Sequence, residues 1–115
     1  MIIRYCHIDY HREIAIAAEI KEKGKNKIAG VARILIEPDM ETGEFAVAVS
    51  DRWQNLGLGT RLTEYVIELA KMKNLKTIVV NTLADNYKML HMGKKLGFAA
   101  GEHEDGMVKL TLELR

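Results

Sequence analysis

The sequence predicts a mixed α/β domain (α+β, mixed sheet), in which an antiparallel meander of strands precedes alternating helices and strands. Three observations predict it. Alternating polar and apolar residues in the first half indicate strands. Two later segments instead space their apolar residues three and four apart, as amphipathic helices do. Between these segments lies an almost continuously apolar stretch, which is typical of a central strand. The expected architecture is one sheet with both antiparallel and parallel strands.

The first half of the chain predicts three strands. Residues 12–22 alternate polar and apolar side chains and are expected to form the first strand. Residues 24–27 are expected to form a turn, after which residues 28–36 return as a second strand and complete a hairpin. Residues 44–50 are expected to form the third strand. Residues 1–10 show no sustained period, so the pattern assigns them no element.

The second half predicts two helices and three strands. Asn74 is a plausible end for the first helix, and Gly97 is expected to close the second. Asp85 is expected to cap the start of the second helix, because its side chain can accept a hydrogen bond from a free backbone N–H. The expected elements are a helix over 57–73, a strand over 77–83, a helix that ends at 96, a short segment over 98–100, a turn at 104–106 and a strand over 107–114.

Composition indicates one ordinary globular domain. The chain has 115 residues, enough for a single core, and we expect residues 1–115 to form one domain. Hydrophobic residues make up 48% and charged residues 29%, values that argue against disorder. The formal net charge of +1 gives no reason to expect nucleic acid or an anionic membrane as the main partner.

Cysteine usage and hydropathy favour a cytoplasmic protein. Cys6 is the only cysteine, so no internal disulfide can form. No apolar run approaches the roughly 18 residues that span a bilayer, and no charged-then-apolar leader opens the chain. His7, Asp9 and His11 alternate, but a metal site would normally need a third or fourth protein ligand and none is spaced to supply one. We therefore expect no metal.

A loop with two glycines joins the third strand to the first helix. Residues 54–59 read Gln-Asn-Leu-Gly-Leu-Gly. The first turn of a helix carries N–H groups without intrahelical partners, and Gly57 and Gly59 lack the Cβ atoms that would hold the backbone away from a pyrophosphate. A nucleotide P-loop would need a lysine where Thr60 stands, and a dinucleotide fingerprint would need a third glycine where Leu62 stands. The loop therefore predicts a phosphate site of another kind.

The spacing Gln-x-x-Gly-x-Gly between a strand and a helix resembles the acyl-CoA pyrophosphate loop of the GNAT superfamily of N-acetyltransferases. Asn86, and Leu-Gly-Phe at 96–98, resemble the downstream asparagine and the helix terminus of that family. The expected order of elements also resembles the GNAT fold from its second strand onward. The resemblance implies a GNAT-type fold, acetyl-CoA as cosubstrate and a primary amine as acceptor.

The same resemblance implies which residues hold the cosubstrate. Backbone groups of residues 47–49 would hold the pantetheine arm, with the Val49 N–H near the thioester oxygen. Residues 55–60 would cradle the pyrophosphate, and Arg61 or Arg52 would supply positive charge. Gln54 would either join this site or stabilise the loop itself. The implied cofactor-binding residues are Val47, Ala48, Val49, Gln54, Asn55, Leu56, Gly57, Leu58, Gly59, Thr60, Arg61 and Asn86.

Glu44 is the candidate general base. A free lysine amine has a pKa of about 10.4, so a carboxylate that accepts its proton would speed transfer near neutral pH. Glu44 lies ten positions before Gln54, which resembles the placement of the catalytic glutamate in the bacterial Pat-type protein lysine acetyltransferases. That branch implies a protein lysine as acceptor, with a small-molecule amine as the alternative. A second interpretation, in which Glu44 is only a polar strand end beside a turn, stays open.

Two departures from the family leave other functions open. The family usually begins with a strand and one or two helices, whereas only about ten residues precede the first clear strand here. Either the sequence is a piece of a longer chain, or the acceptor side is reduced or is supplied by a partner, such as the second copy in a homodimer. Many members carry a tyrosine seven positions after the asparagine, where this chain has Gly93. A thiolate with a pKa near 8.5 needs little protonation, so transfer remains possible.

The alternatives are an acyl-CoA-binding regulatory (sensor) domain and an interaction domain with a vestigial pocket. His91 and His103 are expected to be surface or packing residues.

Overall fold

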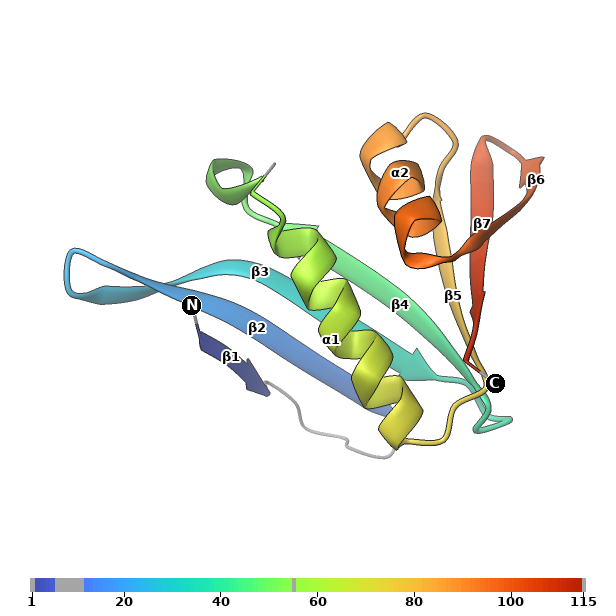
Figure 1. Cartoon of the computed structure of the whole chain (residues 1–115), viewed down its shortest axis with the longest axis horizontal. Helices are drawn as coiled ribbons and strands as arrows, with labels where there is room; N and C mark the ends of the chain where they lie inside the picture. The colour runs from blue at the N-terminus through green and yellow to red at the C-terminus, as the bar shows by residue number, and fades with distance from the viewer. Residues whose placement is uncertain (1, 6–11, 55, 115) are drawn as a thin grey trace.

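One mixed sheet runs through the described chain. The computed structural model describes residues 2–5, 12–54 and 56–114. Seven strands lie in the order β1-β2-β3-β4-β5-β7-β6, and among these pairs only β4 and β5 run parallel (Figure 1). The predicted mixed α/β fold is therefore confirmed. The strands are β1 (Ile2–Tyr5), β2 (Glu13–Glu22), β3 (Lys25–Ile36), β4 (Thr42–Val49), β5 (Thr77–Leu83), β6 (Ala99–Glu104) and β7 (Met107–Glu113).

Both predicted helices are present and lie on the same face of the sheet. Helix α1 (Leu58–Met72) follows a short 3₁₀ helix, η1 (Asp51–Trp53), and packs on β3 and β4. Helix α2 (Tyr87–Leu96) lies beside the β5–β7 half of the sheet (Figure 1). Asn74, with a φ of 62°, and Gly97, with a φ of 98°, adopt the left-handed conformation that ends helices, so both predicted ends are confirmed.

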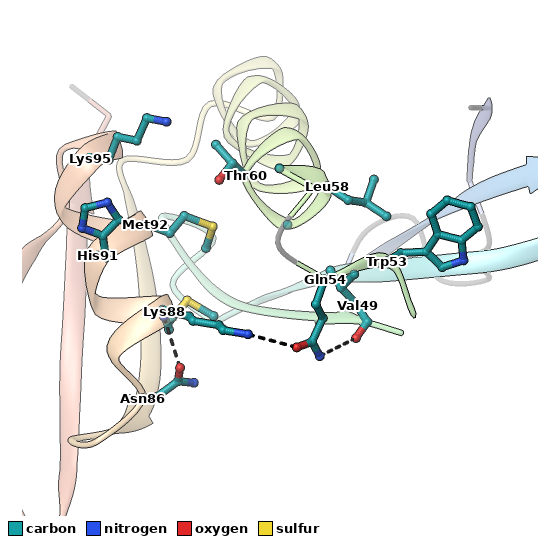
Figure 2. Close-up of a pocket in the computed structure, with 13 residues that line it drawn as sticks. Val49, Trp53, Gln54, Leu58, Thr60, Asn86, Lys88, His91, Met92 and Lys95 are labelled. Carbon is teal, nitrogen blue, oxygen red and sulfur yellow. Dashed lines mark hydrogen bonds between the residues drawn. The ribbon is translucent and has the colours of Figure 1, made fainter. Parts of the chain in front are cut away.

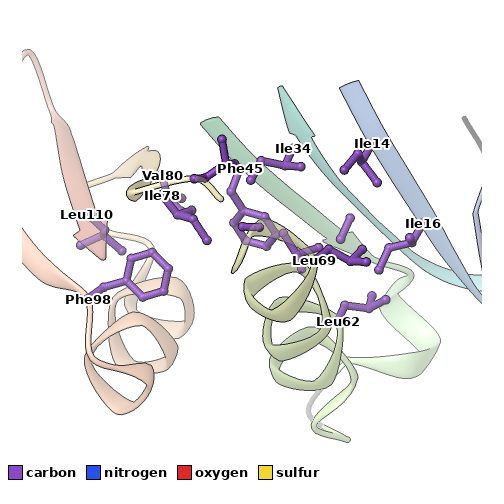
Figure 3. Close-up of a cluster of buried hydrophobic side chains, with 14 of the residues drawn as sticks. Ile14, Ile16, Ile34, Phe45, Leu62, Leu69, Ile78, Val80, Phe98 and Leu110 are labelled. Atoms are coloured by element: carbon purple, nitrogen blue, oxygen red, sulfur yellow. The ribbon is translucent and has the colours of Figure 1, made fainter. Parts of the chain in front are cut away.

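The core fills the space between the sheet and the two helices (Figure 3). Ile16, Ile34 and Phe45 point from neighbouring strands toward helix α1, and they are buried, as is Leu62 on that helix. Gly30 lets α1 approach this closely, because a Cβ atom there would lie 2.9 Å from a methyl carbon of Leu62. No helix from the described residues covers the opposite face of the sheet, where alternate residues of β4 are exposed.

Two tight turns set the register of the hairpins. Lys23 and Gly24 both have positive φ, 51° and 77°, and connect β2 to β3 in two residues. Asp105 and Gly106 do the same between β6 and β7, with φ of 51° and 77°. The predicted turn at 104–106 is close to the observed one. The predicted turn over 24–27 is wrong, because β3 already begins at Lys25 and pairs with the end of β2.

Strand β1 was not predicted from the sequence. It pairs antiparallel with β2 at the edge of the sheet, with Ile3 opposite Ala18. Four residues are too few to display a period of two, so only the presence of β2 beside them identifies the strand. Cys6 and the alternating His7, Asp9 and His11 lie outside the described residues.

No helix in the described part of the chain combines the length and the apolar character needed to cross a membrane. Among the same residues, no three or more His, Cys, Asp and Glu side chains are grouped so that they could hold a metal ion.

Candidate functional site

Strands β4 and β5 separate from one another, and the site lies where they do. Their pairing covers only Thr42, Gly43 and Glu44 of β4, whereas β4 stays paired with β3 as far as Val49. Strand β5 continues on β7 as far as Leu83. The two halves of the sheet therefore diverge from a shared seam (Figure 1).

The backbone of β4 directs polar groups into this gap. The Ser50 N–H donates to the carbonyl of Ala29 at 2.9 Å, so Ser50 and Ala29 form a hydrogen-bonded pair. Antiparallel pairing alternates, and Val49 opposite Gly30 is then a pair without mutual hydrogen bonds. The N–H and C=O of Val49, and by the same alternation those of Val47, point away from β3 and toward the gap.

The glycine loop turns the chain from η1 into α1. Gly57 is the N-cap residue of α1 and has a φ of 80°, a conformation that side chains disfavour. Gly59 is different, because a Cβ atom there would meet a Val49 methyl at 3.6 Å, an ordinary contact. Neither backbone conformation nor protein packing therefore requires glycine at 59. Its absent side chain leaves room for a ligand against the backbone.

The N-terminus of α1 is suited to an anion. Among the described residues, no side chain caps it and no acidic residue lies in its first turn. The Arg61 N–H donates to the Gly57 carbonyl, which leaves the N–H groups ahead of it without intrahelical acceptors. These N–H groups and the helix dipole favour negative charge at Leu58, Gly59 and Thr60.

The side chain of Gln54 joins the loop to its surroundings (Figure 2). Its Nε2 donates to the Val49 carbonyl at 3.1 Å and to Asp51 Oδ1 at 3.2 Å. Its Oε1 accepts from Lys88 Nζ at 3.3 Å, so the same amide reaches across to α2. Gln54 thus holds the end of β4, the loop and the second helix together.

Asn86, not Asp85, caps helix α2. Its Oδ1 accepts from the Met89 N–H at 3.2 Å, and its Nδ2 donates to Thr82 Oγ1 at 3.2 Å. The predicted cap at Asp85 is therefore wrong by one residue. The Thr82 hydroxyl on β5 explains the choice, because it fixes the amide of Asn86 in the capping position.

A cleft of about 460 Å³ lies between the loop and α2, within the usual range for small-ligand sites. Seven of the sequence-predicted residues line it: Val49, Gln54, Gly57, Leu58, Gly59, Thr60 and Asn86. Val47, Ala48, Leu56 and Arg61 do not line it, and Asn55 lies outside the described residues.

Sequence reasoning missed the α2 side of the cleft. Lys88, His91 and Lys95 line it together with Met92, and Trp53 lines the opposite end (Figure 2). The spacing of 88, 91 and 95 places three basic residues on one helical face, a signal that the sequence already contained. His91 is exposed at this cleft and is not part of the core.

Glu44 lies outside the cleft, on the face of the sheet without helices. It is exposed and stands between Leu35 and Val79 in the register, and its carboxylate has no ion pair or hydrogen bond among the described residues. Three strand residues, about 10 Å, separate it from Val47. The end of a ligand that extended from the cleft through the gap between β4 and β5 would approach Glu44 from the cleft side.

The turn before Glu44 is fixed by a carboxylate. Asp39 Oδ1 accepts from the backbone N–H groups of Glu41 and Thr42, at 2.8 and 2.9 Å, and these bonds lower the pKa of Asp39 below its usual value. The turn holds the start of β4, and therefore Glu44, in register with β3.

Gly93 faces the core. A Cβ atom at this position would lie 2.9 Å from a methyl carbon of Leu110 and 3.5 Å from the Phe98 Cβ. A side chain at 93 would therefore point into the packing under α2 and not into the cleft.

Comparison with known proteins agrees with this geometry. A model of the acetyltransferase (GNAT) family matches residues 2–98. Acetyltransferase PA5475 of Pseudomonas aeruginosa is 28% identical over 107 residues, which cover 93% of this chain and 58% of that protein. The chain thus spans little more than half the length of this curated relative.

Two solved structures share the fold. The GNAT domain of S. lividans PAT superposes with a TM-score of 0.82 and 22% identity, over 93% of this chain and 64% of that one. YncA of Salmonella typhimurium, a putative acetyltransferase solved with its cofactor acetyl-CoA, gives a TM-score of 0.77 and 20% identity, over 90% and 65% of the two chains. At these identities the two structures establish the fold alone.

Proposed function

Because this chain belongs to the acetyltransferase (GNAT) family, we propose that it transfers an acetyl group from acetyl-CoA to a primary amine. The observation that carries the proposal is the cleft beside the uncapped N-terminus of α1, which opens onto the gap between β4 and β5. One end of the cleft favours phosphate and the other offers backbone donors for a carbonyl.

The cosubstrate would lie along this cleft. Backbone N–H groups of Leu58, Gly59 and Thr60 would bind the pyrophosphate, and the glycine at 59 admits it without a clash. The pantetheine arm would follow β4 past Asn86. The N–H of Val49 or Val47 would donate to the thioester oxygen and stabilise the negative charge that develops there.

Glu44 would act as the general base. Its carboxylate accepts a proton from the acceptor ammonium, directly or through a water molecule, and the free amine then attacks the thioester carbon. The N–C bond forms, the C–S bond breaks, and CoA leaves as a thiolate, while the nitrogen gives its second proton to water as the amide forms. The transfer occurs in one ternary complex and needs no covalent enzyme intermediate.

A protein lysine is the favoured acceptor, with a small-molecule amine as the alternative. Glu44 is exposed on a sheet face that no described helix covers, so an amine carried by a large partner could reach it. The Pat-like placement of Glu44 supports the same choice. A longer chain or a second copy of this chain would frame that acceptor side.

A second candidate function is an acyl-CoA-responsive regulatory domain. The position of Gly93 favours it, because no tyrosine stands at 93 to protonate the leaving sulfur and a side chain there would enter the core. In that case the cleft would bind acetyl-CoA, whereas Glu44 would have no chemical role.

Calorimetric titration tests the proposal in its first step. Acetyl-CoA and desulfo-CoA should bind with micromolar affinity, and ATP should bind much more weakly. Transfer to lysine-containing peptides, followed by mass spectrometry, tests the second step. Acetyl-CoA binding without any acetylated product would favour the regulatory domain, and no binding at all would overturn both.

A further inference from the structure

Helix α2 presents a basic face to the cleft, defined by Lys88, His91 and Lys95. These residues are three and seven positions apart, so they lie on one side of the helix. All three line the cleft opposite the glycine loop (Figure 2), and no described Asp or Glu lines it with them. The basic face and the N-terminus of α1 therefore enclose one positively charged space.

The two lysines differ in their contacts. The Lys88 ammonium donates to the neutral amide of Gln54, near the end of β4. The Lys95 ammonium has no hydrogen bond or ion pair with any described residue, and the side chain lies on the Thr60 side of the cleft (Figure 2). Since α2 rises about 1.5 Å per residue, the two Cα atoms lie about 10 Å apart. The positive charge is thus distributed along the cleft.

This distribution fits a ligand with separated phosphate groups. Two ammonium groups that share a cleft without a carboxylate repel one another, and a polyanion between them relieves that repulsion. The N–H groups at the start of α1 supply a site for one phosphate, and Lys95 supplies a charge beyond that site. Coenzyme A carries a pyrophosphate and, separately, a phosphate on the ribose 3′ oxygen.

We propose that Lys95 recognises the 3′-phosphate of CoA and makes this protein select CoA over 3′-dephospho-CoA, with Lys88 contributing charge at the pyrophosphate. The inference rests on the proposed acetyl-CoA cleft and assigns a selectivity residue within it. Lysine suits this role because its ammonium acts as a mobile point charge that can follow a phosphate at the rim of a cleft.

The test compares two ligands and two matched variants. Dissociation constants for CoA and 3′-dephospho-CoA are measured by calorimetry for the wild type, Lys95→Gln and Lys94→Gln. Lys94 is the matched control, because it is an exposed neighbour with the same charge but borders a different hollow, beside Leu90 and Phe98. Both substitutions remove one exposed charge and should leave thermal unfolding unchanged.

The wild type should bind CoA about tenfold more tightly than 3′-dephospho-CoA, which corresponds to about 1.4 kcal/mol. Lys95→Gln should reduce this ratio to about twofold by weakening CoA binding alone, and Lys94→Gln should keep it. An unchanged ratio in Lys95→Gln, or an equal loss for both ligands, overturns the inference and leaves the proposed function standing. Failure of the wild type to bind either ligand overturns both.

Discussion

The side-chain amide of Gln54 donates a hydrogen bond to the backbone carbonyl of Val49 across 3.1 Å and accepts another from Lys88. The sequence pattern placed Gln54 in a phosphate loop, but the structure shows why a glutamine suits the position. Only an amide can donate to a strand carbonyl and to Asp51 while accepting from a lysine. The residue therefore shapes the cleft from its edge.

Replacement of Gln54 by leucine should loosen the loop. The variant keeps the approximate volume but removes the bonds to Val49 and Asp51, so the free energy of unfolding should fall by about 1 kcal/mol. Acetyl-CoA affinity should fall roughly fivefold, because the loop loses its fixed position. Urea unfolding and calorimetry measure the two effects. Lys88→Met, which removes only the exposed contact, should change stability by less than about 0.5 kcal/mol.

The two loop glycines should respond differently to alanine. Gly57→Ala forces a Cβ into a φ of 80° and should destabilise the fold by about 1–2 kcal/mol. Gly59→Ala meets only an ordinary contact, so its unfolding curve should match the wild type within about 0.5 kcal/mol, while acetyl-CoA binding weakens at least about tenfold. Thermal unfolding and calorimetry on both variants separate backbone strain from ligand access.

Gly24→Ala is the control for that pair. Gly24 has a φ of 77° and open space around it, but it lies in the β2–β3 turn, away from the cleft. It should lose stability as Gly57→Ala does and keep the wild-type affinity. Normal acetyl-CoA binding by Gly59→Ala would show that the loop backbone does not contact the ligand.

Glu44→Gln should separate chemistry from binding. An exposed carboxylate without described partners contributes little to stability, so the variant should unfold as the wild type does. If Glu44 is the base, turnover should fall by at least about 100-fold while the dissociation constant of acetyl-CoA changes less than about twofold. Glu64→Gln, which removes an exposed carboxylate from α1, should leave both values unchanged. Full turnover in Glu44→Gln would remove Glu44 from the mechanism.

Gly93→Tyr should not create a better enzyme. A tyrosine there must enter the space held by Leu110 and Phe98, so the free energy of unfolding should fall by about 3 kcal/mol and turnover should not rise. Gly93→Ala is the milder comparison. Its gain in helix propensity, about 1 kcal/mol, should roughly offset the free-energy cost of displacing one Leu110 methyl. A stable Gly93→Tyr variant with higher turnover would show that the helix can turn this position toward the cleft.

The hydrophobic patterns predicted most of the fold because they are local. Helix α1 was expected over 57–73 and runs from Leu58 to Met72, and the strand over 77–83 matches β5. The errors depend on partners that no local pattern contains. Strand β1 exists because β2 lies beside it, and Asn86 caps α2 because Thr82, on the preceding strand, positions its amide.

The predicted residues that line the cleft are those that a motif marks, whereas the lining residues on α2 that only spatial proximity brings there were not expected. The glycine loop and Asn86 were found from their resemblance to a family, and both line the cleft. Lys88 and Lys95 reach the same cleft from a helix whose orientation depends on packing around Gly93 and Phe98. The sequence shows their helical spacing, but it does not show which surface they face.

The narrow seam between β4 and β5 also affects how the molecule should unfold. Within the described residues, strand pairing joins β1–β4 to β5–β7 only through Thr42, Gly43 and Glu44, beside which the Glu41 carbonyl accepts from the N–H groups of Lys76 and Thr77. Amide protons of β5 and α2 should therefore exchange with solvent through partial openings that leave the β2–β4 meander intact. A ligand in the cleft contacts both halves, so it should suppress those openings and make exchange across the whole sheet more concerted. Ligand binding would then add a connection between the two halves of the sheet beyond the β4–β5 seam.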